Sequence, residues 1–474
     1  MESSDKLFSV QLPDDGTGCA RELTYTQTRL EIPYITKEGK VEQRPVVLSV
    51  PADAKPPVPL VFVAHYGMDS SAKAWKQYIS NGWAVASTTG WKGIYNEQLS
   101  DNDLVFNNAA LYTLRGLPEI DRDRIAVVGG SAGGYMTLML NGLQLGICCC
   151  VADCPLCNLH FNFHTFFKQA AALHDATWAT LTPEQREEAK QLSSSSDMKE
   201  VRRGMSMAKF PILRSISDGF LKCTANFPDT ENSDRAAALS PIGHAGAFSA
   251  PFVINHYTSD ALVPVDQISR RFTYPTPGSS LPQDFCTRLP DPPKALSDYS
   301  LEELLPADRV AVNHLPTQTA VIDQPFDSEK DYTINIYDEG PMESFSEHRL
   351  IDGKGGTDSV LYLREMLQRG GARTIRLSAE KLRLLLQRYR GESIPLPPHE
   401  GIDDTAYGSL AVYRKEIVCE LRDWMQNHSE TEYRAILGCL TADEQDPALR
   451  DALTRTGEEI LAEILSPVLQ SRIM

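Results

Sequence analysis

The chain has 474 residues, of which 42% are hydrophobic and 23% are charged, so it is long enough to bury a sizeable core. Its formal net charge of -17 at pH 7 repels nucleic-acid backbones and anionic lipid surfaces. No apolar run approaches the length of a membrane-spanning helix. We therefore expect a soluble protein with neither a nucleic-acid partner nor a membrane partner.

Residues 1–57 are expected to form lead-in strands before the main domain. Segments 23–32 and 45–50 alternate apolar and polar residues, which is typical of antiparallel strands. The first residues contain no basic region followed by an apolar segment, so the expected location is cytoplasmic.

From residue 58 onward, short apolar segments alternate with helical stretches, the pattern of a parallel sheet covered by helices on both faces. The expected core comprises residues 58–158 and 249–430. Its expected strands are 59–64, 83–87, 124–129, 148–152, 251–255 and 332–337. The fold class is therefore α/β with a mostly parallel central sheet.

Two connections between these strands are too long to be ordinary loops. Residues 159–248 contain helical and aromatic segments, and we expect a helical cap over the active site. Residues 273–328 are rich in proline, and we expect an irregular insertion on the same rim, because ligand-binding insertions gather at the carboxyl ends of parallel strands. The aromatic residues of the cap fit either an apolar substrate or the cap's own core.

The C-terminal part of the chain is expected to be helical, ending in an extension over residues 431–474. The clearest helices are 377–389 and 448–465, and Asp446-Pro447 is a good start for the second. These helices either cover the core or join copies into a homo-oligomer. The sequence leaves both open.

Ten cysteines occur, and one group of them has the spacing of a metal site. Cys154 and Cys157 form a Cys-x-x-Cys pair, followed by His160 and His164. The long separation between two ligand pairs of a zinc finger is missing, and so is the glutamate of a His-Glu-x-x-His site. Since residues 148–150 lie in an apolar run, we expect packing cysteines and no metal.

The most informative motif is Gly-Gly-Ser-Ala-Gly over residues 129–133. It follows an apolar strand and precedes a helical run from Tyr135 to Leu143. A sharp strand-to-helix turn of this kind exposes a serine hydroxyl above the sheet, and its tight backbone requires small residues on both sides. The motif therefore predicts that Ser131 is a nucleophile.

Residues 121–135 strongly resemble the nucleophile segment of prolyl-oligopeptidase-type serine hydrolases, within the α/β-hydrolase superfamily. Residues 250–267 are similar to that family's strand, acidic turn and Val-Pro. The resemblance implies that Asp260 supports the catalytic histidine. The alternative role for Asp260 is that of a turn residue that caps the helix beginning near Pro264.

His348 is the expected catalytic histidine, because the triad histidine follows the last strand and the chain order is then Ser, Asp, His. The family tends to place a Gly-His pair directly after the strand, whereas here Gly340 is followed by proline. His314 is the main competitor, but it precedes the last strand. His174, like His160 and His164 of the cap, is expected to be a surface or packing residue.

The resemblance also implies an oxyanion hole at the end of strand 59–64. Tyr66 aligns with a tyrosine that donates to the oxyanion in this family, and backbone N–H groups of Tyr66 or Gly67 are the alternative donors. The N–H of Ala132, at the start of the nucleophile helix, is expected to be the second donor. Aromatic packing is the other interpretation of Tyr66.

Peptidases of this family usually carry an N-terminal propeller, and some 56 residues are too few for one, so esterase-like members are the better comparison. The expected function is hydrolysis of an ester, thioester or amide of a mid-sized, partly apolar small molecule, without a cofactor. The alternatives are a C–C bond hydrolase, an acyltransferase, a peptidase, or a binding protein that keeps the fold without catalysis.

Overall fold

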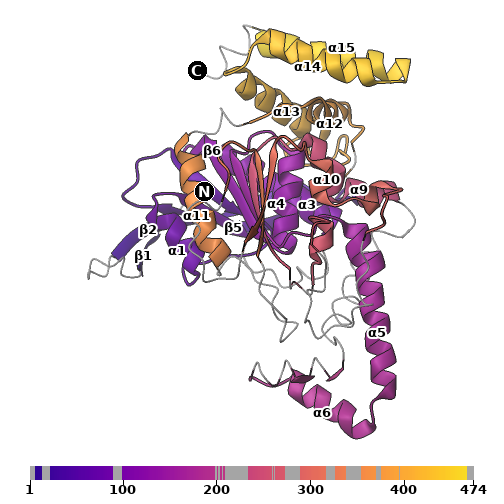
Figure 1. Ribbon diagram of the computed structural model, residues 1–474. Coiled ribbons are helices and arrows are strands. Elements are labelled where there is room, and N and C mark those ends of the chain that lie inside the picture. The colour runs from indigo at the N-terminus through magenta and orange to yellow at the C-terminus, as the bar shows by residue number, and fades with distance from the viewer. Residues whose placement is uncertain are drawn as a thin grey trace.

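In the computed structural model of the chain, ten strands of the described residues form one sheet in the order β1-β2-β3-β5-β4-β6-β7-β8-β10-β9 (Figure 1). The structure describes residues 6–12, 22–88, 99–197, 200, 203–204, 207–208, 233–258, 260, 262–272, 289–315, 326–337, 354–369, 375–393 and 395–466.

The first strands of the sheet are antiparallel, and the remaining strands are parallel to one another. The antiparallel part consists of β1 (Lys6–Gln11), β2 (Glu22–Ile35) and β3 (Val41–Pro51), and β3 also runs antiparallel to its next neighbour, β5. The parallel part consists of β4 (Val58–Val63), β5 (Ala84–Thr88), β6 (Ile120–Gly130), β7 (Cys149–Asp153), β8 (Phe252–Tyr257), β10 (Tyr332–Tyr337) and β9 (Val310–Leu315). All six predicted parallel strands are confirmed.

Strand β9 corrects the expectation that residues 273–328 are irregular throughout. It lies at the sheet edge and pairs with β10 alone among the described strands, with Asn313 opposite Asn335. An edge strand has a neighbouring strand on one side only. Most residues of β9 are accordingly intermediate in exposure. The segment therefore lacks the continuous apolar run by which the buried parallel strands are found in a sequence.

Helices cover both faces of the sheet. One face packs against α1 (Lys73–Ser80) and α11 (Lys354–Arg369), and the other packs against α3 (Asp101–Arg115) and α4 (Ala132–Leu143). Val127 and Val128 are adjacent on β6 and belong to the two different hydrophobic clusters. Figure 1 shows the sheet between α11 and α4. This arrangement confirms the expected α/β-hydrolase fold.

The segment expected to be a cap is helical where it is described. It contains the π-helix η1 (His160–Phe166), α5 (Phe167–Thr180), α6 (Pro183–Ser193), α9 (Ser233–Ala238) and the 3-10 helix η3 (Pro241–Ala247). Helices α5 and α6 extend away from the sheet (Figure 1). The helix η3 packs against α4. A lid role for α5 and α6 stays a prediction, as do the domain boundaries.

Short helical turns follow β8. They are the 3-10 helices η4 (Val265–Gln267) and η6 (Leu296–Asp298), and the single α-helical turn α10 (Leu301–Leu304). The N–H of Glu302 donates to the carbonyl of Ile268 at 2.9 Å, which joins α10 to the turn after β8. These turns therefore belong to the carboxyl edge of the sheet.

Helices α12 (Ala379–Arg390), α13 (Leu410–Met425), α14 (Glu430–Asp443) and α15 (Pro447–Leu465) form a third hydrophobic cluster. Both helices predicted in this region are confirmed, and Asp446 caps α15 by accepting from the N–H of Ala448 at 2.9 Å. Of these four helices, α14 and α15 lie farthest from the sheet (Figure 1). Their expected role in joining copies of the chain stays a prediction.

Buried charges connect this helical region to the nucleophile helix. The ammonium of Lys381 donates to the carbonyls of Asn141, Gly142 and Gln144 at 2.6 to 2.8 Å, which satisfies the C-terminal end of α4. The guanidinium of Arg388 donates to the carbonyl of Leu143 at 2.9 Å. The far end of the helix that starts at the nucleophile is therefore fixed by α12.

Among the described residues, no helix combines the length and the apolarity that crossing a lipid bilayer requires.

Candidate active site

Ser131 lies between the end of β6 and the start of α4 in a backbone conformation that L-residues rarely adopt. Its φ is 56° and its ψ is -121°, and its side chain is partly exposed while its neighbours are buried. Its N–H donates to the carbonyl of Asp153 at 2.8 Å, and its carbonyl accepts from Tyr135 at 2.9 Å. Such strain costs about 1 to 3 kcal/mol and persists only where the surrounding structure enforces it.

Two glycines make this turn sterically feasible. A Cβ on Gly129 would lie 2.4 Å from the backbone of Gly133, and a Cβ on Gly133 would lie 2.8 Å from the carbonyl oxygen of Ala64. Strand β6, helix α4 and the end of β4 therefore meet at backbone contact. These are the positions where the Gly-x-Ser-x-Gly motif requires its glycines.

A cavity of about 420 Å³ adjoins the nucleophile turn. It is lined by the carboxyl end of β4 and by the residues just before Ser131, namely Val63, Ala64, Tyr66, Gly67, Met68, Asp69, Ser71, Ala72, Gly129 and Gly130. The expected oxyanion residues Tyr66 and Gly67 thus share a cavity with the end of β6. Most of the lining is apolar, as in small-molecule sites.

A larger cavity of about 540 Å³ lies at the other end of the sheet. Its lining includes Pro251 and Asp331, which directly precede β8 and β10. Ligands of open α/β sheets bind outside the carboxyl ends of the strands. The smaller cavity beside Ser131 is therefore the candidate active site.

Tyr66 is positioned by a buried network that the sequence analysis did not identify. The preceding residue, His65, has a φ of 68°, and its Nδ1 lies 2.7 Å from Oδ2 of Asp103. The N–H of His65 donates to Oδ1 of Asn107 at 3.0 Å, and its carbonyl accepts from the hydroxyl of Thr88 at 2.8 Å. Because these contacts join β4, α3 and β5, no local pattern around His65 could reveal them.

The backbone at Tyr66 narrows the choice of oxyanion donors. The N–H of Tyr66 donates to the carbonyl of Ala64 at 2.8 Å, so it is engaged in its own turn. The Tyr66 ring lies close to Gly133, since a Cβ on that glycine would approach Cδ2 of Tyr66 to 3.3 Å. Ala132 is the first residue of α4, and its N–H has no acceptor within the helix. The expected donors that this leaves as candidates are the Tyr66 phenol and the N–H groups of Gly67 and Ala132.

For Tyr66→Phe we expect kcat to fall by about ten- to a thousandfold while KM changes little, because a donor aimed at the oxyanion acts mainly in the transition state. The measurement is steady-state hydrolysis of an activated ester. A kcat within about twofold of the wild type would mean that Tyr66 only packs, since phenylalanine keeps the ring volume. The hole would then consist of backbone N–H groups.

Asp260 follows β8 and is fully buried. Its Oδ1 accepts from the N–H groups of Leu262 and Val263, both at 2.9 Å. Asp260 therefore closes the turn before Pro264, but it does not cap the helix η4, whose N-cap residue is Pro264 and which has no side-chain cap hydrogen bond. These bonds use Oδ1 and fix the orientation of the carboxylate, which is also what a residue supporting a histidine requires.

A chain of side-chain hydrogen bonds, here called the ladder, joins four neighbouring strands near their carboxyl ends. The amide of Asn255 donates to Asp153 at 2.8 Å, the amide of Asn335 donates to Asn255 at 3.1 Å, and the amide of Asn313 donates to Asn335 at 3.0 Å. Burial raises the pKa of Asp153 to about 7. The ladder connects β7, β8, β10 and β9 near their carboxyl ends. Cys154 directly follows β7, and Asp260 lies in the turn after β8.

The expected catalytic histidine, His348, lies outside the described residues, so its role stays a prediction. The competitor, His314, is an exposed residue of β9 whose ring lies 5.0 Å from that of Phe272. Strand β9 is four positions from β6 in the sheet, which corresponds to roughly 19 Å at about 4.8 Å per strand. His314 is therefore poorly placed to take a proton from Ser131.

Among the histidines of the helical segment, His174 has contacts within that segment. Nδ1 of His174 lies 2.7 Å from the carbonyl oxygen of Ala208, and its ring is 5.6 Å from that of Trp178. His160 begins η1, and the side chain of His164 lies outside the described residues. His174 thus packs within its own segment.

Residues 91–219 match the prolyl oligopeptidase family, which confirms the resemblance around the nucleophile. The matched segment includes Ser131 and Ala132, while Tyr66, Gly67, Asp260 and His348 lie outside it. A comparison with curated protein sequences gives no match.

Solved structures with a similar fold include several hydrolases. Puromycin hydrolase is 13% identical, with a TM-score of 0.39, covering 72% of this chain and 39% of its own. The chain thus spans about two fifths of that protein. The 2,6-dihydroxy-pseudo-oxynicotine hydrolase is 14% identical with a TM-score of 0.37, and the match covers 71% of this chain and 68% of that one. Acetyl xylan esterase from Paenibacillus sp. R4 is 12% identical with a TM-score of 0.35, and the match covers 77% of this chain and 89% of that one. At this level the similarity carries no information on substrate.

Proposed function

From the premise that the segment around Ser131 belongs to the prolyl oligopeptidase family, we propose that the chain is a serine hydrolase acting through an acyl-enzyme. Its substrate is an ester, thioester or amide of a mid-sized, partly apolar small molecule. Ser131 is the nucleophile, His348 the general base, and Asp260 the residue that orients the histidine.

The observation that carries this proposal is the strained conformation of Ser131. A non-glycine residue with φ 56° and ψ -121°, held between two glycines in backbone contact, is the geometry of a nucleophile elbow. A merely structural turn would accept glycine at this position and avoid the strain. Ser131 is partly exposed and the two residues before it line a cavity, which supports access of a substrate to the hydroxyl.

In the proposed reaction, His348 removes the hydroxyl proton as the Ser131 oxygen attacks the substrate carbonyl. The N–H of Ala132, with Gly67 or the Tyr66 phenol, stabilises the oxyanion of the tetrahedral intermediate. The histidine then protonates the leaving group, and water attacks the acyl-enzyme by the reverse sequence to release the acid. Asp260 keeps the imidazole in the required tautomer.

The size and lining of the cavity support a small substrate. Its volume of about 420 Å³ falls within the range of ordinary small-molecule sites, which is roughly 300 to 1,000 Å³. Its walls combine Val63, Ala64 and Met68 with the polar groups of Tyr66 and Asp69. An acyl group of moderate size fits such a lining.

The test combines an active-site probe with a substrate panel. We expect a fluorophosphonate to label the wild-type chain at one serine, and esters, thioesters and amides of graded acyl length to show a length optimum. Labelling identified at Ser131 by peptide mapping would support the proposal. Absence of both labelling and turnover across the panel would instead favour a binding protein that keeps the fold.

A further inference from the structure

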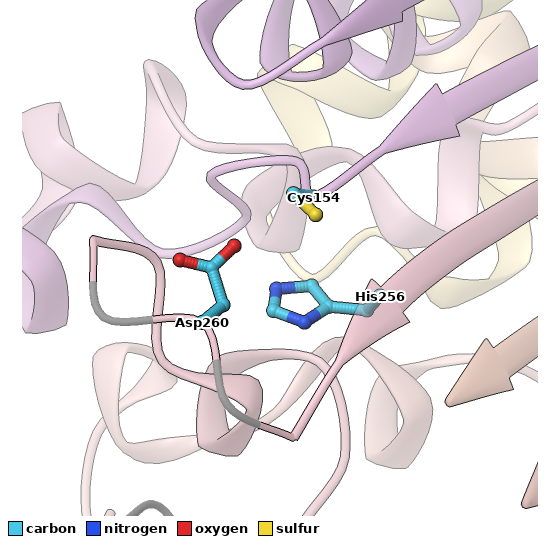
Figure 2. A group of neighbouring side chains, drawn as sticks. All are labelled: Cys154, His256 and Asp260. Carbon is cyan, nitrogen blue, oxygen red and sulfur yellow. The ribbon is translucent and has the colours of Figure 1, made fainter. Parts of the chain in front are cut away.

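Three side chains with metal-binding atoms meet at the carboxyl ends of β7 and β8. The Sγ of Cys154, a ring nitrogen of His256 and a carboxylate oxygen of Asp260 all lie within 4.8 Å of one another. All three residues are fully buried. Figure 2 shows the three side chains converging, with the Nε2 edge of the His256 ring facing the carboxylate.

Each of the three side chains is held in place by the backbone. Cys154 has a φ of 45°, which is unusual for a non-glycine residue, and its N–H donates to the carbonyl of Asn255 at 2.8 Å. The Nδ1 of His256 accepts from the N–H of Tyr257 at 2.8 Å and lies 3.1 Å from the Tyr257 carbonyl oxygen. Oδ1 of Asp260 is fixed by its own turn. The cluster is thus largely preformed.

The chemistry of this ligand set selects a borderline-soft transition metal. Thiolate, imidazole and carboxylate are the ligands of Zn²⁺ in proteins, whereas Mg²⁺ and Ca²⁺ prefer oxygen alone. Zinc bonds of about 2.0 to 2.3 Å place tetrahedral ligands roughly 3.3 to 3.8 Å apart, so each pair of ligand atoms must approach by about 1.5 Å at most. When Nε2 binds a metal, the ring proton resides on Nδ1, so the hydrogen bond that the Tyr257 N–H donates to Nδ1 must give way to one from Nδ1 to the Tyr257 carbonyl.

We infer that Cys154, His256 and Asp260 bind Zn²⁺ as three of its ligands and that the bound ion inhibits hydrolysis. The inhibition rests on the proposed function, because Asp260 bound to a cation no longer supports His348. Metal binding itself does not depend on it.

The sequence pattern had paired Cys154 with Cys157 instead. In the structure Cys157 belongs to the main hydrophobic core, while Cys154 packs with Tyr257 and Tyr337. His256 is 102 positions away in the chain and faces Cys154 only because β7 and β8 are neighbours. Cys157, also fully buried, is the matched control for removal of a thiol.

The binding test uses Co²⁺ as a spectroscopic substitute for zinc in the full chain, first dialysed against a chelator. We expect one Co²⁺ per chain and a thiolate-to-cobalt charge-transfer band, displaced by Zn²⁺. The band should be lost in Cys154→Ala and kept in Cys157→Ala. His256→Gln should weaken binding by at least about tenfold, and it serves as a second variant if Cys154→Ala does not fold. A missing band, or one that Cys157→Ala also loses, would overturn the site.

The inhibition test adds Zn²⁺ to the chelator-treated enzyme with an activated ester, and each rate is compared with that of the same variant without metal. We expect inhibition that a chelator reverses, and a concentration for half-inhibition at least about tenfold higher in Cys154→Ala than in Cys157→Ala. Equal sensitivity of the two variants would refute the coupling to Asp260. If the metal-free chain shows no hydrolysis, the proposed function fails, while the cobalt band still decides the metal site.

Discussion

Replacing Ser131 with alanine is expected to abolish fluorophosphonate labelling and to lower turnover by about three to six orders of magnitude. The substitution removes the attacking oxygen, and what remains is the catalysis provided by binding and the oxyanion hole. The measurement is kcat on the best ester of the panel, together with labelling followed by mass spectrometry.

Ser71→Ala is the matched control for this variant. Ser71 lines the same cavity, but its hydroxyl donates to Oδ1 of Asp69 at 2.5 Å in an exposed turn. We expect Ser71→Ala to keep its labelling and most of its turnover. The unfolding temperature of Ser131→Ala should equal that of the wild type, because alanine keeps the Cβ and therefore the same strain at this φ. Substantial turnover by a folded Ser131→Ala would disprove the assignment of the nucleophile.

The parts of the fold that the sequence predicts are those specified by local patterns. The six buried parallel strands are runs of apolar residues, and the elbow at Ser131 is a short motif whose glycines are needed within five positions. The start of α15 at Asp446 and Pro447 follows from capping rules in the same way. In each case the residues that determine the structure are neighbours in the chain.

Features that depend on contacts between distant segments could not be predicted. His65 and Asp103 are 38 positions apart, and their pairing follows from the packing of α3 beside the end of β4. Cys154 and His256 meet only because β7 and β8 pair in the sheet. Strand β9 pairs with β10 at the edge of the sheet, where a segment with only a weak apolar pattern can form a strand. The sequence shows which residues carry reactive side chains, but it does not show which of these side chains come into contact in the fold.

The identity of the general base follows from a comparison of His348 with His314. We expect His348→Ala to lower kcat/KM by about three orders of magnitude or more, because the hydroxyl of Ser131 then has no base. For His314→Ala we expect less than about a twofold change, since its ring is exposed on β9 and lies four strands from the nucleophile. Both variants are assayed with the same activated ester, and unchanged circular dichroism establishes that they are folded. If only His314→Ala caused a large loss of kcat/KM, the general base would be His314 on β9. This edge strand would then have to move toward β6 during the reaction.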